Sequence, residues 1–68
     1  MIVRYDKLWT IMITNKMKKS ELAKAAELSQ YTMTKLNQDR LVPMEVMLRL
    51  CKIFHCDLGD LMEVIEND

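Results

Sequence analysis

The sequence predicts an all-α domain, a compact bundle of five helices. The chain of 68 residues holds a single Gly and a single Pro, so few residues in it interrupt helices. Its apolar residues recur at spacings of three and four, which place side chains on one face of a helix. Half of the residues are apolar, which indicates a folded chain, and the length suits one domain over residues 1–68.

The first helix is predicted from Tyr5 to about Thr14, after a short extended arm at residues 1–4. Its apolar face is broad, and Leu8 and Ile11 are the expected core pair. We expect Trp9 to pack at the edge of the domain.

The second and third helices are predicted within the stretch Lys18 to Gln38, KKSELAKAAELSQYTMTKLNQ, joined by a tight turn. Ser29 is the expected N-cap of the third helix, because its hydroxyl can accept a free backbone N–H. Apolar pairs spaced four apart in the second helix and three apart in the third are expected to face the core: Leu22 with Ala26, and Met33 with Leu36.

The fourth helix is predicted to begin near Pro43, a residue that suits the first turn of a helix. Its apolar residues fall at i, i+3, i+4 and i+7: Met47, Leu50, Cys51 and Phe54. A fifth helix is predicted from about Gly59 to Ile65, capped by Asp57. In it Leu61 and Met62 turn inward, while Val64 and Ile65 stay near the surface.

The charges of the chain are divided between its halves, although the net charge is zero. Residues 1–40 hold eight Lys or Arg against four Asp or Glu, a balance of +4. Residues 41–68 hold two against six, a balance of −4. Because phosphates respond to the local field, this division predicts a one-sided positive face with moderate affinity for nucleic acid.

Several classes of protein are excluded at this stage. No apolar run approaches the roughly 20 residues of a membrane span, and no signal peptide is visible, so a cytoplasmic location is expected. One His and no phosphate-cradling Gly loop leave no catalytic set, so we expect no enzyme. Cys51, His55 and Cys56 supply at most three ligands at a spacing unlike zinc sites, so no metal or other cofactor is expected.

Two motifs carry a family resemblance: MKKSELAKAAELSQYTMTKL and, at the usual distance, MLRLCKIFHCDLGDLM. With these motifs the chain resembles the Cro/cI-type (XRE, lambda-repressor-like) helix-turn-helix family, in particular its small single-domain members. The resemblance covers Leu8 to Met62, with the helix-turn-helix at about residues 18–38. It implies a lambda-repressor-like DNA-binding domain and a sequence-specific transcriptional regulator, a repressor by expectation, acting on double-stranded DNA.

Three positions depart from the family pattern. Glu27 stands where the family usually has Gly, in the turn between the second and third helices, and Lys16 stands where it often has Gly after the first helix. A left-handed conformation costs either residue about 1 kcal/mol relative to Gly. Pro43 replaces a frequent Ser or Thr cap.

The resemblance also implies the DNA contacts, because the start of the third helix lies in the major groove in this family. The implied base-reading residues are Gln30, Tyr31, Thr34 and Lys35. The implied phosphate-binding residues are Lys18, Lys19, Thr32 and Arg40. Gln can bond adenine through two hydrogen bonds, Lys can reach guanine acceptors, and Tyr can pack on a thymine methyl group. The alternative is that these are ordinary solvated residues on a polar face.

A homodimer on a palindromic operator is expected, because one helix-turn-helix covers only a few base pairs. Met44, Val64 and Ile65 are apolar and not all needed by the core, so the dimer contact is predicted near the fourth and fifth helices. No membrane partner and no small-molecule substrate are expected. The alternative function is an antitoxin-like or adaptor module that keeps this fold and binds a protein through its acidic, Met-rich second half.

Overall fold

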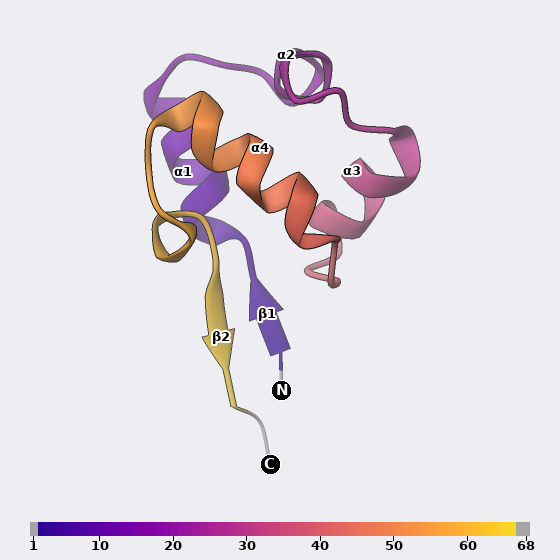
Figure 1. Ribbon diagram of the computed structural model, residues 1–68, viewed down its shortest axis with the longest axis vertical. Helices are drawn as coiled ribbons and strands as arrows, with labels where there is room; N and C mark the ends of the chain where they lie inside the picture. The colour runs from indigo at the N-terminus through magenta and orange to yellow at the C-terminus, as the bar shows by residue number, and fades with distance from the viewer. Residues whose placement is uncertain (1, 67–68) are drawn as a thin grey trace.

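The computed structural model describes residues 2–66, in which four α-helices surround one apolar core. Its elements, in chain order, are β1 (Ile2–Arg4), α1 (Asp6–Thr14), α2 (Lys19–Ala25), α3 (Gln30–Asn37), α4 (Met44–Phe54), the 3-10 helix η1 (Leu58–Asp60) and β2 (Glu63–Ile65). Helix α4 crosses the centre of the fold with α1, α2 and α3 around it, and the two strands lie side by side at one end (Figure 1). The predicted all-α class and the first four helices are confirmed.

The predicted fifth helix is wrong. Residues 58–60 form a single 3-10 turn, and Glu63–Ile65 forms strand β2, which pairs antiparallel with β1. In this register Val64 lies opposite Val3, and Ile65 lies opposite Ile2. These β-branched side chains favour a strand, and pairing with the N-terminal arm satisfies backbone groups that a helix of about two turns would satisfy poorly. Asp57 does begin the 3-10 turn, where its N–H donates to the Asp60 carboxylate at 3.0 Å.

All four α-helices end in the same way. A residue with φ between 52° and 55° follows each helix, and the next N–H donates to the carbonyl five residues back. The left-handed residues are Lys16, Glu27, Asp39 and His55. The N–H groups that close the four ends belong to Met17, Leu28, Arg40 and Cys56. This is the Schellman arrangement, which is usually built on Gly, and here every left-handed residue carries a Cβ at a cost of about 1 kcal/mol.

The core lies between α4 and the three helices around it. Five leucines are fully buried at 0 % exposure, one from each α-helix and one directly after η1: Leu8, Leu22, Leu36, Leu50 and Leu61. Burial of a leucine side chain contributes about 1.5–3 kcal/mol, so this set supplies a large part of the apolar stabilisation. Ala26 is also buried, which lets α2 approach its neighbours closely.

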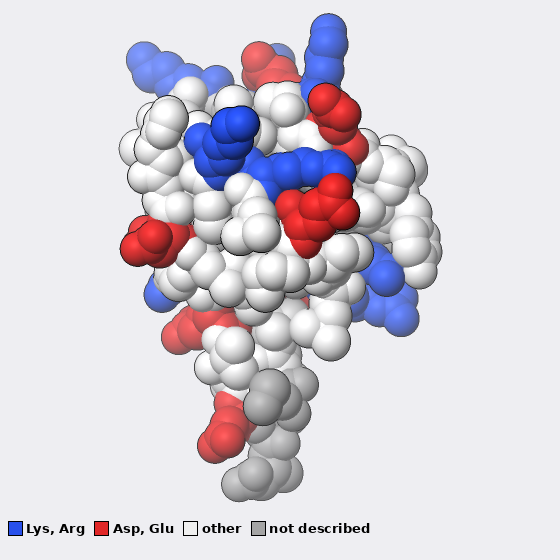
Figure 2. All heavy atoms as spheres, in the orientation of Figure 1, with Lys and Arg blue, Asp and Glu red and all other residues white. Residues whose placement is uncertain are grey.

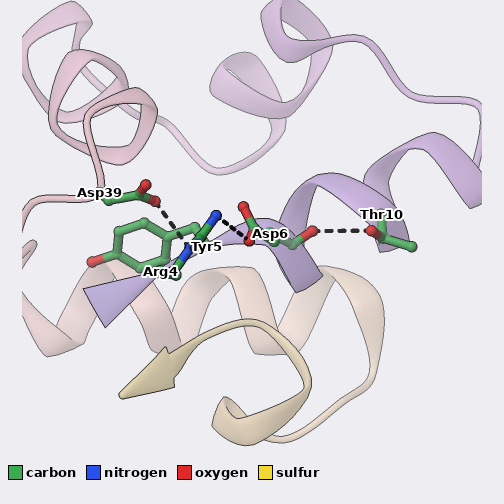
Figure 3. Close-up of polar contacts among 5 residues, drawn as sticks. All are labelled: Arg4, Tyr5, Asp6, Thr10 and Asp39. Carbon is green, nitrogen blue, oxygen red and sulfur yellow. Dashed lines mark hydrogen bonds and ion pairs between the residues drawn. The ribbon is translucent and has the colours of Figure 1, made fainter. Parts of the chain in front are cut away.

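Tyr5 ties the start of α1 to the loop after α3. Its N–H donates to the Asp39 carboxylate at 3.1 Å, and its hydroxyl donates to the Arg40 carbonyl at 2.8 Å. The ring itself is 1 % exposed, and burial raises the pKa of the Tyr5 hydroxyl above its ordinary value of 10.0. Figure 3 shows Asp39 reaching the Tyr5 backbone, next to the Arg4–Asp6 ion pair at 2.9 Å. The C-terminal end of α3 is therefore fixed to the N-terminal part of the chain.

Candidate nucleic-acid interface

The start of α3 is set by its cap. The Thr32 N–H donates to the Ser29 hydroxyl oxygen at 3.1 Å, which confirms the predicted N-cap, and the Ser29 hydroxyl donates to Thr32 Oγ1 at 3.0 Å. Because the cap uses the Thr32 N–H, the N–H groups of Gln30 and Tyr31 are those left for an outside acceptor. A phosphate at this end would meet Thr32 through its hydroxyl.

The outer face of α3 carries two adjoining rows of polar side chains. Gln30, Thr34 and Asn37 follow at i, i+4 and i+7, and all three are exposed. Beside them, Tyr31 is 70 % exposed, and the Lys35 ammonium lies 4.6 Å from its ring centroid. The buried residues of the helix, Met33 and Leu36, point to the opposite face. The structure thus gathers the four predicted base-reading residues on one side of α3.

Two of the other predicted phosphate-binding residues, Lys18 and Arg40, have exposed side chains just outside α2 and α3. Lys18 precedes α2 with its side chain exposed, and its N–H donates to the Glu21 carboxylate at 2.9 Å. Arg40 follows α3 with an exposed side chain, while its backbone is fixed by Tyr5 and by a bond to the Lys35 carbonyl. A fixed backbone under a free cationic side chain suits a phosphate contact.

Lys19, the fourth predicted phosphate-binding residue, is engaged within the protein. Its ammonium donates to Asn37 Oδ1 at 2.6 Å and lies 4.4 Å from the centroid of the Trp9 ring. The three residues come from α2, α3 and α1, so a single ammonium joins three helices. Trp9 is half-buried at the edge of the core, as expected from the sequence.

Charge is unevenly spread over the surface. On the face shown in Figure 2, most Lys and Arg side chains lie in the half occupied by α2, while the half toward the strands is largely uncharged or acidic. One ion pair across α4, Arg49 with Glu45 at 2.8 Å, lowers the free positive charge of this helix. On this face the Lys and Arg side chains are thus concentrated away from the two strands.

The predicted dimer residues occupy two places. Met44, on α4, and Val64, on β2, are each 55 % exposed, whereas Ile65 is half-buried by its pairing with Ile2. Two further apolar side chains near Met44 are more exposed: Leu41 at 72 % and Leu48 at 59 %. Leu48 lies four residues after Met44 and therefore shares its face of α4.

The cysteines lie elsewhere. Cys51, His55 and Cys56 line a surface pocket with Asp57 and Asp60 at the end of α4. Within residues 2–66, no three His, Cys, Asp or Glu side chains are arranged to hold a metal ion. Burial, followed by the nearby Cys51 thiol, raises the pKa of Cys56, so less of the nucleophilic thiolate forms. The helices of this same part of the chain are also too short or too polar to cross a membrane.

Asn37 and Trp9 were not identified as part of this surface by sequence reasoning. For Asn37 a signal existed, because it stands seven residues after Gln30 and therefore on the same row of α3. Its bond to Lys19 joins residues 18 positions apart, and no periodicity predicts such a contact. The contact between Lys19 and the Trp9 ring also joins two different helices, so sequence spacing could not predict it.

The chain matches the profile of a DNA-binding domain in sequence and resembles a transcriptional regulator in structure. The profile of the Cro/C1-type HTH DNA-binding domain matches residues 7–67. Among solved structures, the chain is similar to the transcriptional regulator VanUg in a crystal form designated Form II. The sequence identity is 38 %, the TM-score is 0.92, and the alignment covers 97 % of this chain and 88 % of that one. No curated protein sequence matches the chain significantly.

Proposed function

The chain belongs to the Cro/C1-type helix-turn-helix DNA-binding family, and from that premise we propose that it is a sequence-specific transcriptional regulator that reads the major groove with α3. The observation that supports this proposal most strongly is the outer face of α3. Its side chains are free of the core, while the helix is held at its start by Ser29 and just beyond its end by Tyr5. Such a rigid helix with an unoccupied polar face suits docking into a groove.

Base reading falls to Gln30, Tyr31, Thr34 and Lys35. Gln30 stands at the first position of α3, where a side-chain amide can bond adenine through two hydrogen bonds. Lys35 can leave the exposed Tyr31 ring for a guanine acceptor, because an exposed cation–π contact is worth only about 0.5–1 kcal/mol. Thr34 donates its hydroxyl to the Gln30 carbonyl at 2.9 Å, which leaves its methyl group and its oxygen lone pairs for a base edge.

Phosphate binding falls to Lys18, Lys19, Thr32 and Arg40, which flank the reading face. These contacts set the register of the protein on the duplex without reading its sequence. Each cation that neutralises a phosphate also releases a counterion, so affinity falls as salt rises. The balanced net charge of the chain predicts moderate rather than tight binding to random DNA.

A two-fold homodimer on a palindromic operator completes the proposal, with repression by occupation of the site. Its support is the exposed apolar surface of α4 and the preceding loop, which consists of Leu41, Met44 and Leu48 and which we term the α4 apolar face. Burying these side chains against a second copy would remove them from water, and a two-fold dimer would present two α3 helices, as a palindromic site requires. We also propose that the protein acts in the cytoplasm, where it would bind its DNA.

The exposed α4 apolar face also supports a competing function. As an antitoxin-like or adaptor module, the protein would bind another protein through the α4 apolar face and the acidic residues of the second half of the chain. DNA binding would then be absent or purely electrostatic. No catalytic role is part of either proposal.

The test begins with selection of bound duplexes from a random DNA pool. The chain is then titrated with the best duplex and with a scrambled duplex at several salt concentrations. We expect at least roughly a thousandfold preference for the selected duplex and a linear fall of log affinity with log salt concentration. Equal binding to both duplexes would contradict sequence-specific regulation and favour the interaction module.

A further inference from the structure

The ammonium of Lys19 is held in place before any ligand arrives. Most surface lysines sample many rotamers, because the charged head is well hydrated and the stem is flexible. Lys19 differs, since the Asn37 amide oxygen accepts from it at 2.6 Å and the Trp9 ring lies 4.4 Å away. Two independent contacts from two other helices therefore restrain its exposed side chain.

Its two partners stand on well-anchored parts of the fold. Trp9 packs against the core from α1, so its ring is a rigid platform rather than a mobile side chain. Asn37 is the last residue of α3, immediately before the turn that Tyr5 pins through Asp39 and Arg40. An ammonium has three N–H donors, and the bond to Asn37 uses one of them. Lys19 thus keeps donors for an outside oxygen while its position is set.

The second lysine–aromatic pair provides a contrast. Lys35 lies over Tyr31, but that ring is 70 % exposed and belongs to the same helix, so the pair can rearrange together. The Lys19 pair joins different helices and rests on a half-buried ring. An adaptable pair suits base reading, in which side chains must find particular atoms. A fixed cation suits the phosphate backbone, whose charges recur at regular intervals.

Location supports the same assignment. Asn37 shares the outer row of α3 with Gln30 and Thr34, so its bond places the Lys19 ammonium beside the proposed reading face. A phosphate bound there would lie at the edge of the groove that α3 enters. Preorganisation matters because an ordered side chain loses less rotamer freedom on binding.

We propose that Trp9 and Asn37 are positioning residues that hold the Lys19 ammonium as a preset phosphate anchor, an inference that rests on the proposed DNA-binding function. The anchor fixes the register of α3 in the groove without reading a base. Asn37 and Trp9 act only through Lys19 and do not themselves contact DNA.

The experiment is a double-mutant cycle measured by DNA titration on the selected and the scrambled duplex. Lys19→Met keeps an unbranched side chain of similar length but removes the charge, so affinity should fall roughly tenfold on both duplexes and the salt slope by about one. Asn37→Ala should weaken both duplexes roughly threefold while the slope stays near that of the parent, because the charge remains. In the Lys19→Met background, Asn37→Ala should have no further effect.

Conservative variants provide the controls. Trp9→Phe keeps an aromatic platform and should bind nearly as the parent does, whereas Trp9→Leu should lose about as much as Asn37→Ala. Melting curves identify any variant that binds weakly because it is unfolded, and the cycle on the exposed residues Lys19 and Asn37 keeps the test decisive if Trp9→Leu is unstable.

The other possible outcomes distinguish failure of the positioning role from failure of the proposed DNA-binding function. Additive effects of Asn37→Ala and Lys19→Met would overturn the positioning role and leave sequence-specific binding intact. A loss by Asn37→Ala on the selected duplex alone would also overturn it, because Asn37 would then read a base. Failure of the parent chain to bind any duplex would overturn both this inference and the proposed function.

Discussion

The backbone N–H of Tyr5 donates to the carboxylate of Asp39 at 3.1 Å, across 34 positions of the chain. Asp39 reaches it from a left-handed conformation, φ 53°, directly after the turn that ends α3. The same tyrosine returns a bond from its hydroxyl to the next carbonyl, that of Arg40. Through these two residues the proposed reading helix is coupled to the start of α1, as Figure 3 shows for the Asp39 contact.

Removal of the Asp39 carboxylate should destabilise the fold. Asp39→Ala leaves the partly buried Tyr5 N–H without its acceptor and puts alanine in a left-handed conformation, so the free energy of unfolding should fall by about 1–2 kcal/mol. Asp39→Asn keeps an amide oxygen and tolerates this conformation, and it should lose less than half as much. Urea denaturation of the two variants measures both values. Equal losses would show that the charge, rather than the acceptor, stabilises the turn.

The buried Tyr5 hydroxyl predicts a loss of stability at alkaline pH. Burial raises its pKa in the folded state, and the Asp39 charge acts in the same direction. The unfolded chain therefore releases this proton at lower pH than the folded one, so the contribution is complete below pH 10.0 and is lost as pH rises above it. Tyr5→Phe should remove this part of the pH dependence in urea denaturation, whereas Tyr31→Phe should retain it.

Glu27 offers a test of backbone strain. It has φ 55° between α2 and α3, where its family usually has Gly. Glu27→Gly should raise the free energy of unfolding by up to about 1 kcal/mol and preserve DNA binding. Glu27→Ala keeps a Cβ in the left-handed conformation and should bring no such gain. A clear drop in the melting temperature of Glu27→Gly would show that the Glu27 side chain makes a stabilising contact that outweighs the strain.

The fold was predictable from sequence wherever the pattern within one element was enough to identify it. Each of α1 to α4 has an apolar stripe at helical spacing, so local sequence was sufficient. Val64 and Ile65 were misassigned because their partners, Val3 and Ile2, lie at the other end of the chain. A stretch of seven residues with Leu, Met, Val and Ile suits a helix or a strand, and only the distant pairing decides between them.

The candidate site shows the same division. The outward position of Gln30, Tyr31, Thr34 and Lys35 follows from the buried positions of Met33 and Leu36 within one helix. The left-handed conformations of Asp39 and His55 were not predicted, because the family pattern places Gly only at the positions of Lys16 and Glu27. The contacts of Lys19 needed three helices to be placed together before they could be seen.

Self-association should depend on the α4 apolar face. Leu48→Glu puts a charge among Leu41 and Met44, which are exposed in the single chain, so folding should be unaffected while dimers dissociate. Sedimentation should show a dimer for the parent on a palindromic duplex and a monomer for this variant. Ile13→Glu is the matched control, because Ile13 is 69 % exposed on α1. A parent that stays monomeric both at high concentration and on the palindrome would contradict the dimer.

The most direct test of the central claim is a titration of Gln30→Ala and Lys35→Ala on the selected and the scrambled duplex. If α3 reads the bases, each variant should lose about 1–3 kcal/mol on the selected duplex and little on the scrambled one, so that specificity flattens. Lys18→Ala, which removes a proposed phosphate contact, should instead weaken both duplexes alike. Parent-like binding of the selected duplex by both Gln30→Ala and Lys35→Ala would show that α3 is not the reading helix.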